Sequence, residues 1–243
     1  MLESFVWGLI STSSLLIGAL IVRIRPPGER VLGAVMAFGA GVLISAVSFE
    51  LIDEAISVPG GKVGTIIGFF GGAVVFTAGD IAISRWGYSN RKDIGGESHD
   101  APPMAIVLGT FLDGVPESAV LGLTVLRFGE VGIAMLVAVF ISNIPESIAA
   151  TTSLLASGWK QRQVLLLWTS IALVCAVAAV LGYVLLDNAS AAVISAMFAF
   201  AAGAILTMLA TSMMPEAYEH AREWAGISTV FGFAVALAVN LSA

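Results

Sequence analysis

Residues 103–126 read PMAIVLGTFLDGVPESAVLGLTVL, an apolar run with two carboxylates and a proline at its centre. A helix that spans a bilayer needs about 20 mainly apolar residues, so this run is long enough to cross. A charged side chain at the centre of a bilayer costs at least about 2.5 kcal/mol on insertion scales. The run therefore predicts a membrane helix whose central acids have a function.

The composition excludes most soluble classes of protein. The chain has 243 residues, of which 58% are hydrophobic and only 12% are charged, whereas a soluble domain carries about 25% charged residues. We therefore expect an integral membrane protein with the lipid bilayer as its solvent. The sequence has no basic patch and a net charge of −6, which argues against nucleic acid as a partner. The N-terminus lacks the pattern of a cleaved signal peptide, so its first apolar run is expected to remain as a span.

Short polar breaks divide the chain into apolar runs of spanning length. Each run must be helical, because lipid cannot satisfy open backbone groups, and no connection is long enough to hold a soluble domain. We predict an all-α membrane protein with eight transmembrane helices in a single domain, residues 1–243. The expected spans are residues 5–22, 31–51, 63–84, 103–126, 131–157, 163–186, 190–214 and 224–242.

The basic residues alternate between the two sides of the predicted membrane. Nine lie in the breaks after odd-numbered spans and two in the breaks after even-numbered spans. The positive-inside rule places the side with nine in the cytoplasm and both termini on the extracytoplasmic side. The short breaks favour a prokaryotic plasma (inner) membrane. The nine are Arg23, Arg25, Arg30, Arg85, Arg91, Lys92, Lys160, Arg162 and Arg222, and the two are Lys62 and Arg127.

Two pairs of segments repeat within the chain. Residues 38–55 read FGAGVLISAVSFELIDEA and residues 200–217 read FAAGAILTMLATSMMPEA. Residues 113–118 read DGVPES and residues 142–147 read SNIPES. In the predicted orientation the two members of each pair run in opposite directions. Inverted repeats that meet near the midplane are typical of transporters.

The centres of the fourth and fifth spans carry the polar residues that point to chemistry. Asp113 and Glu117 are four residues apart and share a helix face, as do Asn143 and Glu146 at a spacing of three. No Lys or Arg lies at matching depth in any span, so the acids are either protonated or neutralised by a cation. Carboxylate and amide oxygens, with the hydroxyl of Ser142, suit a divalent metal.

Each motif also places a proline at mid-depth. Pro116 cannot donate a hydrogen bond to the carbonyl of Leu112, and Pro145 cannot donate one to the carbonyl of Ile141. A freed carbonyl beside an acid is costly in lipid and useful at an ion site. A plain proline kink would explain the neighbouring serines but leaves the three acids unexplained. We therefore favour an ion pathway.

The motifs and their positions resemble the ZIP (Zrt/Irt-like) family of divalent metal transporters, which have eight spans with both ends outside. The family typically carries His-Asn-x-Pro-Glu-Gly on its fourth span, where this chain has residues 113–118. The patterns of spans two and seven, and the acid near the end of span three, also resemble the family. The resemblance implies that the metal-binding residues are Asp113, Glu117, Asn143, Glu146 and Ser142, with Asp80 as a further candidate.

The chain departs from the family pattern in ways that bear on the metal. Neither motif keeps a histidine, Gly114 stands where the family often has an Asn ligand, and Cys175 aligns with an acid of the family's second metal position. The resemblance then implies one metal rather than two. Zinc is the default substrate, whereas an oxygen-rich ligand set suits Mn²⁺ or Fe²⁺ equally and leaves Cd²⁺ open. A homodimer is a further partner that the sequence leaves open.

The predicted function is transport of a divalent cation through a midplane site between spans four and five. The cation would enter past Asp53 and Glu50, although Glu50 could instead simply reach the interface. It would leave past Asp80 or the acids near Glu216, while spans two and seven belong to a bundle that moves against the rest, which resembles the elevator-like motion proposed for the family. A proton-coupled carrier of another solute and a non-transporting ZIP-like membrane scaffold or sensor stay open. We do not expect an enzyme, because the serines have no His or Lys base at their depth.

Overall fold

The structure, a computed structural model, describes residues 1–85 and 103–242, and these two ranges contain helices and no strand. The all-α prediction is therefore confirmed. Arg91, Lys92 and His99 of the longest predicted break lie outside the described residues. The helices are α1 (Leu2–Ile24), α2 (Glu29–Ala46), η1 (Val47–Ile52), α3 (Asp53–Ser57), α4 (Lys62–Arg85), α5 (Pro103–Phe128), α6 (Ile133–Ala156), α7 (Gln161–Leu186), α8 (Ala191–Met208), η2 (Leu209–Met213), α9 (Met214–Ala221) and α10 (Glu223–Ser242).

Helix boundaries fall where the sequence cannot continue a helix. Arg25 is extended, with φ −162° and ψ 109°, directly before two prolines, and this ends α1. Three other breaks turn at glycines with positive φ, namely Gly60 at 79°, Gly129 at 79° and Gly158 at 89°. Glycine takes this conformation without the steric cost that a Cβ atom brings.

Seven helical segments of the described residues are long and apolar enough to cross a membrane: Leu2–Ile24, Glu29–Ser57, Lys62–Ile83, Ile133–Ala156, Gln161–Leu186, Ala191–Ala221 and Glu223–Ser242. Seven of the eight predicted spans therefore have the length and hydropathy that a membrane-spanning helix needs. The remaining predicted span is α5, a helix of 26 residues.

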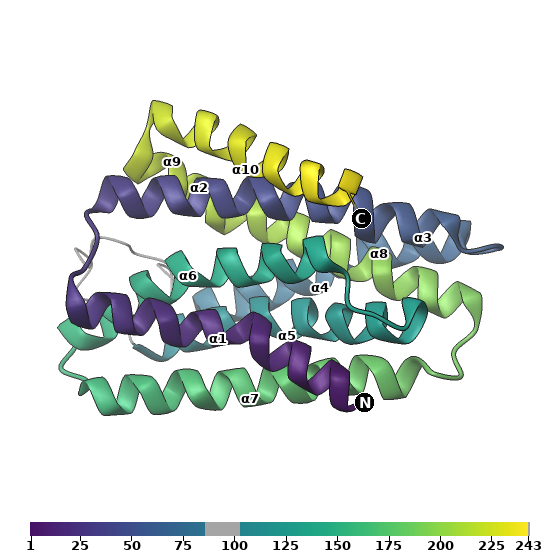
Figure 1. Cartoon of the computed structure of the whole chain (residues 1–243), viewed down its shortest axis with the longest axis horizontal. Helices are drawn as coiled ribbons and strands as arrows, with labels where there is room; N and C mark the ends of the chain where they lie inside the picture. Colours follow the sequence, from purple (N-terminus) through teal and green to yellow (C-terminus); the bar gives the residue numbers. More distant parts are fainter. Residues whose placement is uncertain (86–102, 243) are drawn as a thin grey trace.

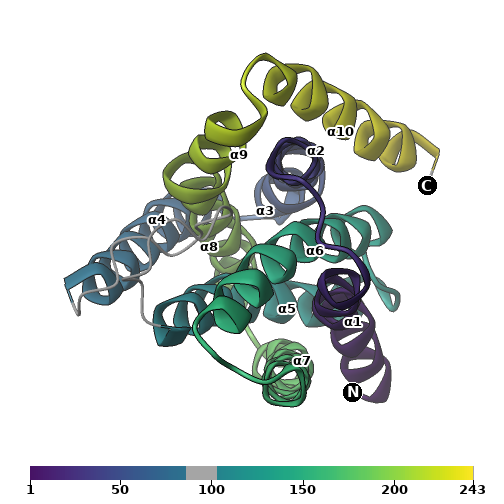
Figure 2. The same ribbon diagram turned by 90° about the vertical axis from the view of Figure 1, so that its left-hand side faces the viewer.

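The helices pack as two groups that meet along α2, α5, α6 and α8. In the first group, α1 packs against α6 and α7, and α5 packs against α7. In the second, α4 packs against α8, and α2 packs against α9 and α10. Contacts of α2 with α6 and of α5 with α8 join the groups (Figure 1). Seen from one end, α6 lies near the middle of the bundle, between α2 and α7 (Figure 2).

The repeat of residues 38–55 and 200–217 has a structural counterpart. Both segments contain a π-helical turn, and the two turns, η1 and η2, fall at aligned positions of the repeat. The two segments run in opposite directions along the bundle (Figure 1). A π-helical turn is rare and often marks a functional position, so its occurrence at equivalent places in both segments supports the inverted repeat.

Aligned glycines make equivalent close contacts in the two halves. A Cβ on Gly41 of α2 would overlap the carbonyl oxygen of Thr229 in α10, and a Cβ on the aligned Gly203 of α8 would overlap that of Phe69 in α4. Small residues allow membrane helices to approach backbone to backbone. The pair α2–α10 is therefore repeated as the pair α8–α4.

Both chain ends lie toward the same end of the bundle as α3 and the α5–α6 turn (Figure 1). We call this the α3 end. The α1–α2, α6–α7 and α9–α10 connections, which carry most of the described basic residues of the larger set, lie at the opposite end (Figure 1). The two sets of basic residues are therefore separated in space, as the sequence predicts.

Candidate metal centre

The polar residues of the two Pro-Glu motifs are buried inside the first helix group. On α5, Asp113 is 4% exposed and Glu117 is 2% exposed. On α6, Asn143 is 3% exposed and Glu146 is 5% exposed. α5 and α6 contact each other, so the two helices that carry these acids are direct neighbours. Burial at this level confirms that the acids do not simply reach the surface.

Each motif proline lies inside a continuous helix, Pro116 in α5 and Pro145 in α6. Ser142, which is 1% exposed, donates its hydroxyl to the carbonyl of Val139 at 3.2 Å. A hydroxyl that donates once still has lone pairs to offer as an acceptor. Ser142 therefore keeps the capacity to contact a cation.

Two glycines let neighbouring helices reach α6 at the level of its motif. A Cβ on Gly39 of α2 would lie 3.2 Å from Cα of Ser142. A Cβ on Gly18 of α1 would overlap Oγ of Ser147. The motif segment of α6 is thus enclosed by α1 on one side and by α2, of the other helix group, on another.

Cys175 of α7 lies directly beside the α5 motif. Its Sγ is 3.1 Å from the position that a Cβ on Gly114 would occupy, and its thiol neighbours Ser118 and Glu117. Cys175 itself is fully buried. Cys175, which the resemblance aligns with the family's second metal position, therefore lies next to the predicted ligand Glu117.

Asp80 lies on α4, in the second helix group, and is half buried. The preceding residue, Gly79, packs against the side chain of Leu112 on α5, with 3.1 Å from its ideal Cβ position to Cδ1. Leu112 directly precedes Asp113 in the sequence. Asp80 therefore lies across the boundary between the groups from the α5 motif.

The described residues contain no cluster of three or more His, Cys, Asp or Glu side chains placed to hold a metal ion. The three predicted acidic ligands, Asp113, Glu117 and Glu146, are therefore not gathered into such a cluster in this structure. The ligand assignment stays a prediction.

A second group of acids lines a cavity of about 340 Å³ at the α3 end. It includes Glu50, Asp53, Glu54 and Glu130. Glu50 also accepts hydrogen bonds from the backbone N–H of Met135, at 3.1 Å to Oε1 and 3.0 Å to Oε2. The sequence left open whether Glu50 lines the entry or reaches the interface. In the structure it lines the cavity and also accepts hydrogen bonds at the start of α6.

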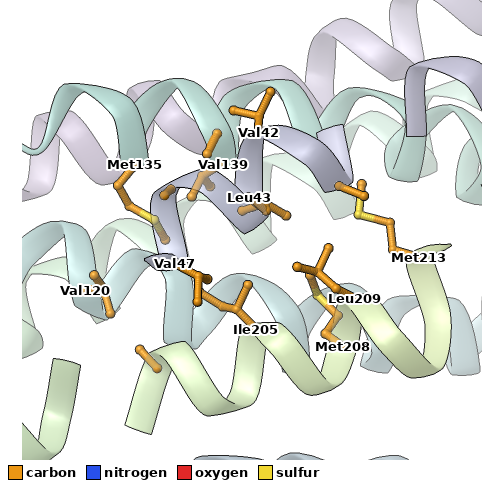
Figure 3. Close-up of a cluster of buried hydrophobic side chains, with 14 of the residues drawn as sticks. Val42, Leu43, Val47, Val120, Met135, Val139, Ile205, Met208, Leu209 and Met213 are labelled. Atoms are coloured by element: carbon orange, nitrogen blue, oxygen red, sulfur yellow. The ribbon is translucent and has the colours of Figure 1, made fainter. Parts of the chain in front are cut away.

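Apolar side chains lie between this cavity and the buried motifs. On α6, Met135 and Val139 lie between the start of the helix and Ser142. They gather with Val47 of η1 and Val120 of α5 in the core cluster, together with residues of α8 and η2 (Figure 3). All four of these side chains are buried. These side chains form an apolar layer between the acidic cavity and the motifs.

Sequence reasoning missed Thr110, which is 4% exposed on α5. It lies three residues before Asp113 and seven before Glu117, so all three fall on one helix face. The spacing was visible in the sequence. A single threonine is common in membrane helices, however, and only its burial on the same helix face as the acids makes it a candidate for the site.

Buried acids on neighbouring helices, inside a bundle with inverted repeats, are typical of a membrane transporter. The model of the ZIP zinc transporter family matches residues 103–240, which is more than half of the chain. The chain therefore belongs to the ZIP family. Family membership identifies it as an integral membrane protein that transports divalent metal cations, as transporters rather than enzymes make up this family. Comparison with individual curated proteins gives no match.

Proposed function

We propose that the chain carries its divalent cation through a site formed by Asp113, Glu117, Asn143, Glu146 and Ser142. The observation that carries the proposal is the burial of three carboxylates, none more than 5% exposed, on the neighbouring helices α5 and α6. Carboxylate oxygens, together with the amide of Asn143 and the hydroxyl of Ser142, are ligands that suit a divalent cation.

The whole chain acts as one transporter domain in this proposal, with α5 as its eighth span. Eight crossings return the chain to the side on which it started, which fits the position of both termini at the α3 end (Figure 1). The separation of the basic residues supports assigning the α3 end to the extracytoplasmic side of a plasma membrane. The cavity lined by Asp53 and Glu54 is then the entry.

The substrate is one Zn²⁺ ion per cycle, by the default of the family. The oxygen-rich ligand set also accommodates Mn²⁺, Fe²⁺ or Cd²⁺. The neighbouring thiol of Cys175 favours the softer ions Zn²⁺ and Cd²⁺ among these. Metal selectivity therefore depends on whether Cys175 joins the carboxylates.

The proposed transport route is based on the apolar layer and on the two helix groups. An ion in the acidic cavity reaches the motifs only if the layer of Val47, Val120, Met135 and Val139 opens. Sliding of the group α1, α5, α6 and α7 against α2, α4, α8 and α10 would carry Val120, Met135 and Val139 away from Val47 of η1 and so open this layer. Release on the opposite side would pass Asp80 or the acids near Glu216.

Uptake of Zn²⁺ into proteoliposomes tests the assignment. Wild type should accumulate Zn²⁺, and Glu117→Ala and Glu146→Ala should each lose most of that uptake, with Asp80→Ala affected less. Asp187→Asn removes an exposed acid in the α7–α8 turn and serves as the control. Undiminished uptake in both Glu variants would refute the site.

Elemental analysis of the purified protein after soaking in Zn²⁺, Mn²⁺, Fe²⁺ or Cd²⁺ identifies the ion. Metal bound by wild type and lost in Glu117→Ala supports the site independently of uptake. Binding without uptake would instead indicate a sensor. Solute transport that is insensitive to metal would indicate a proton-coupled carrier.

A further inference from the structure

Two carboxylates of the second span reach across the boundary between the helix groups at the α3 end. Glu50 and Glu54 are four residues apart, in η1 and α3. Glu50 accepts from the backbone N–H of Met135 near the start of α6. Glu54 accepts from Nε of Arg127 near the end of α5, at 2.7 Å. Both ends of the α5–α6 turn are therefore held by the same short segment.

The contact of Glu50 is built into the start of α6. The first N–H groups of a helix have no partner within it, and the helix dipole makes this end attractive to a carboxylate. Glu50 contacts the N–H groups of both Ala134 and Met135. A Cβ on Gly132 would lie only 2.8 Å from Oε2 of Glu50. The glycine therefore leaves room for the carboxylate to approach the start of α6.

The segment that carries the two carboxylates is itself fixed within the second group. Ser195 of α8 donates to the carbonyl oxygen of Ala55 at 2.7 Å. Thr65 of α4 lies 2.7 Å from the hydroxyl of Ser195 and also donates to Ala55 at 3.0 Å. α3, α4 and α8 are thus tied together at this end. A force that separates the groups would act on the contacts of Glu50 and Glu54.

We propose that Glu50 and Glu54 form a latch that holds the two helix groups together at the α3 end and opens when the transport cycle exposes the motifs there. The proposal rests on the function proposed above. The latch lies beside the apolar layer, since Met135 belongs to both. Opening it would therefore release one wall of that layer.

Hydrogen exchange tests whether the groups separate at this place. Glu54→Arg removes the pair with Arg127 and places two like charges together. We expect the amides of residues 136–142 to exchange about threefold to fivefold faster, the scale of one exposed ion pair. Glu50 and Glu54 bond Met135 and Arg127 and not these amides. Faster exchange would therefore report separation of the two helix groups and not the loss of a hydrogen-bond acceptor.

The exchanged pair Glu54→Arg with Arg127→Glu is the matched control, because it restores the attraction with the charges reversed. Exchange should return to the wild-type rate. Unchanged exchange in Glu54→Arg, or no recovery in the double variant, would overturn the latch. Size-exclusion profiles that match wild type exclude misfolding as the cause.

Cross-linking tests whether the latch must open during transport. Glu54→Cys with Arg127→Cys, joined by a short bifunctional thiol reagent, should lose Zn²⁺ uptake and regain it on reductive cleavage of the linker. Thr65→Cys with Ser195→Cys joins two helices of the same group and should keep its uptake when cross-linked. Cys175 is fully buried and can remain in both variants.

The outcomes separate the latch from the proposed function. Equal uptake by the linked and cleaved forms of the Glu54–Arg127 variant would overturn the latch and leave the transport assignment standing. Absence of Zn²⁺ uptake in wild type would refute the function. The exchange experiment would then still decide whether the two groups part at Glu54.

Discussion

Gly114 of α5 and Cys175 of α7 face each other so closely that the sulfur lies 3.1 Å from where a Cβ on residue 114 would be. Helix propensity favours Ala over Gly by about 1 kcal/mol, but here the added methyl must push the thiol aside. We predict that Gly114→Ala is stabilising by about 1 kcal/mol more in a Cys175→Ala background than in the native chain. Thermal unfolding of the four variants in detergent measures this coupling. Additive effects would contradict the contact.

Gly71 and Gly72 are neighbours in α4 that differ in what surrounds them. A Cβ on Gly72 would overlap the carbonyl oxygen of Phe200, whereas one on Gly71 would meet only the ring of Phe200 at 3.8 Å. We predict that Gly72→Ala lowers the free energy of unfolding by about 1–3 kcal/mol. Gly71→Ala should be neutral or raise it by up to about 1 kcal/mol. Similar effects at both positions would argue against the close packing of α4 on α8.

The indole of Trp168 donates to the hydroxyl of Thr151 at 2.9 Å, and both residues are fully buried. Thr151→Val keeps the shape of the side chain but leaves a buried N–H without an acceptor. We predict a loss of about 1–3 kcal/mol in the free energy of unfolding. Thr169→Val, in the exposed part of the same helix α7, serves as the control and should change stability by much less. A loss of equal size in the control would contradict the assignment.

Metal binding at the motifs should weaken as the pH falls. Metal and proton compete for the same carboxylates, so each bound metal ion releases protons and a lower pH favours the protonated, metal-free form. Titration of Zn²⁺ binding across a pH series measures how steeply the Zn²⁺ affinity changes with pH. Glu117→Gln should bind more weakly and show a smaller slope, because Gln does not titrate. An affinity that is independent of pH would count against the carboxylate site.

Much of the fold could be predicted because hydropathy is a local property. Each apolar run is long enough by itself to specify a helix in lipid, and the structure shows helices at all eight predicted runs. The exceptions lie at the ends. The second span continues through η1 to Ser57 and the seventh through η2 to Ala221, past their predicted ends. Hydropathy does not mark these extensions, because their polar residues can remain helical outside the lipid.

The candidate site was only partly predictable. Asp113, Glu117, Asn143 and Glu146 stood out because charged and amide groups are rare at mid-span, and their burial agrees with that expectation. Glu50 was expected either to line the entry path or to reach the interface, and its contact with the start of α6 was not predicted. Its contact with Met135 joins residues 85 positions apart, and no spacing rule connects them.

The sequence alone determined the membrane environment, the helical class, the mid-span acids and the repeated segments, because each follows from the order of residues within a single helix. The tertiary structure decided which helices form each group, which acid holds the start of α6, and that Cys175 faces the α5 motif. These depend on where the backbones of distant segments can approach, as at Gly41 and Gly203. That packing is what separates the motifs from the acidic cavity in this structure.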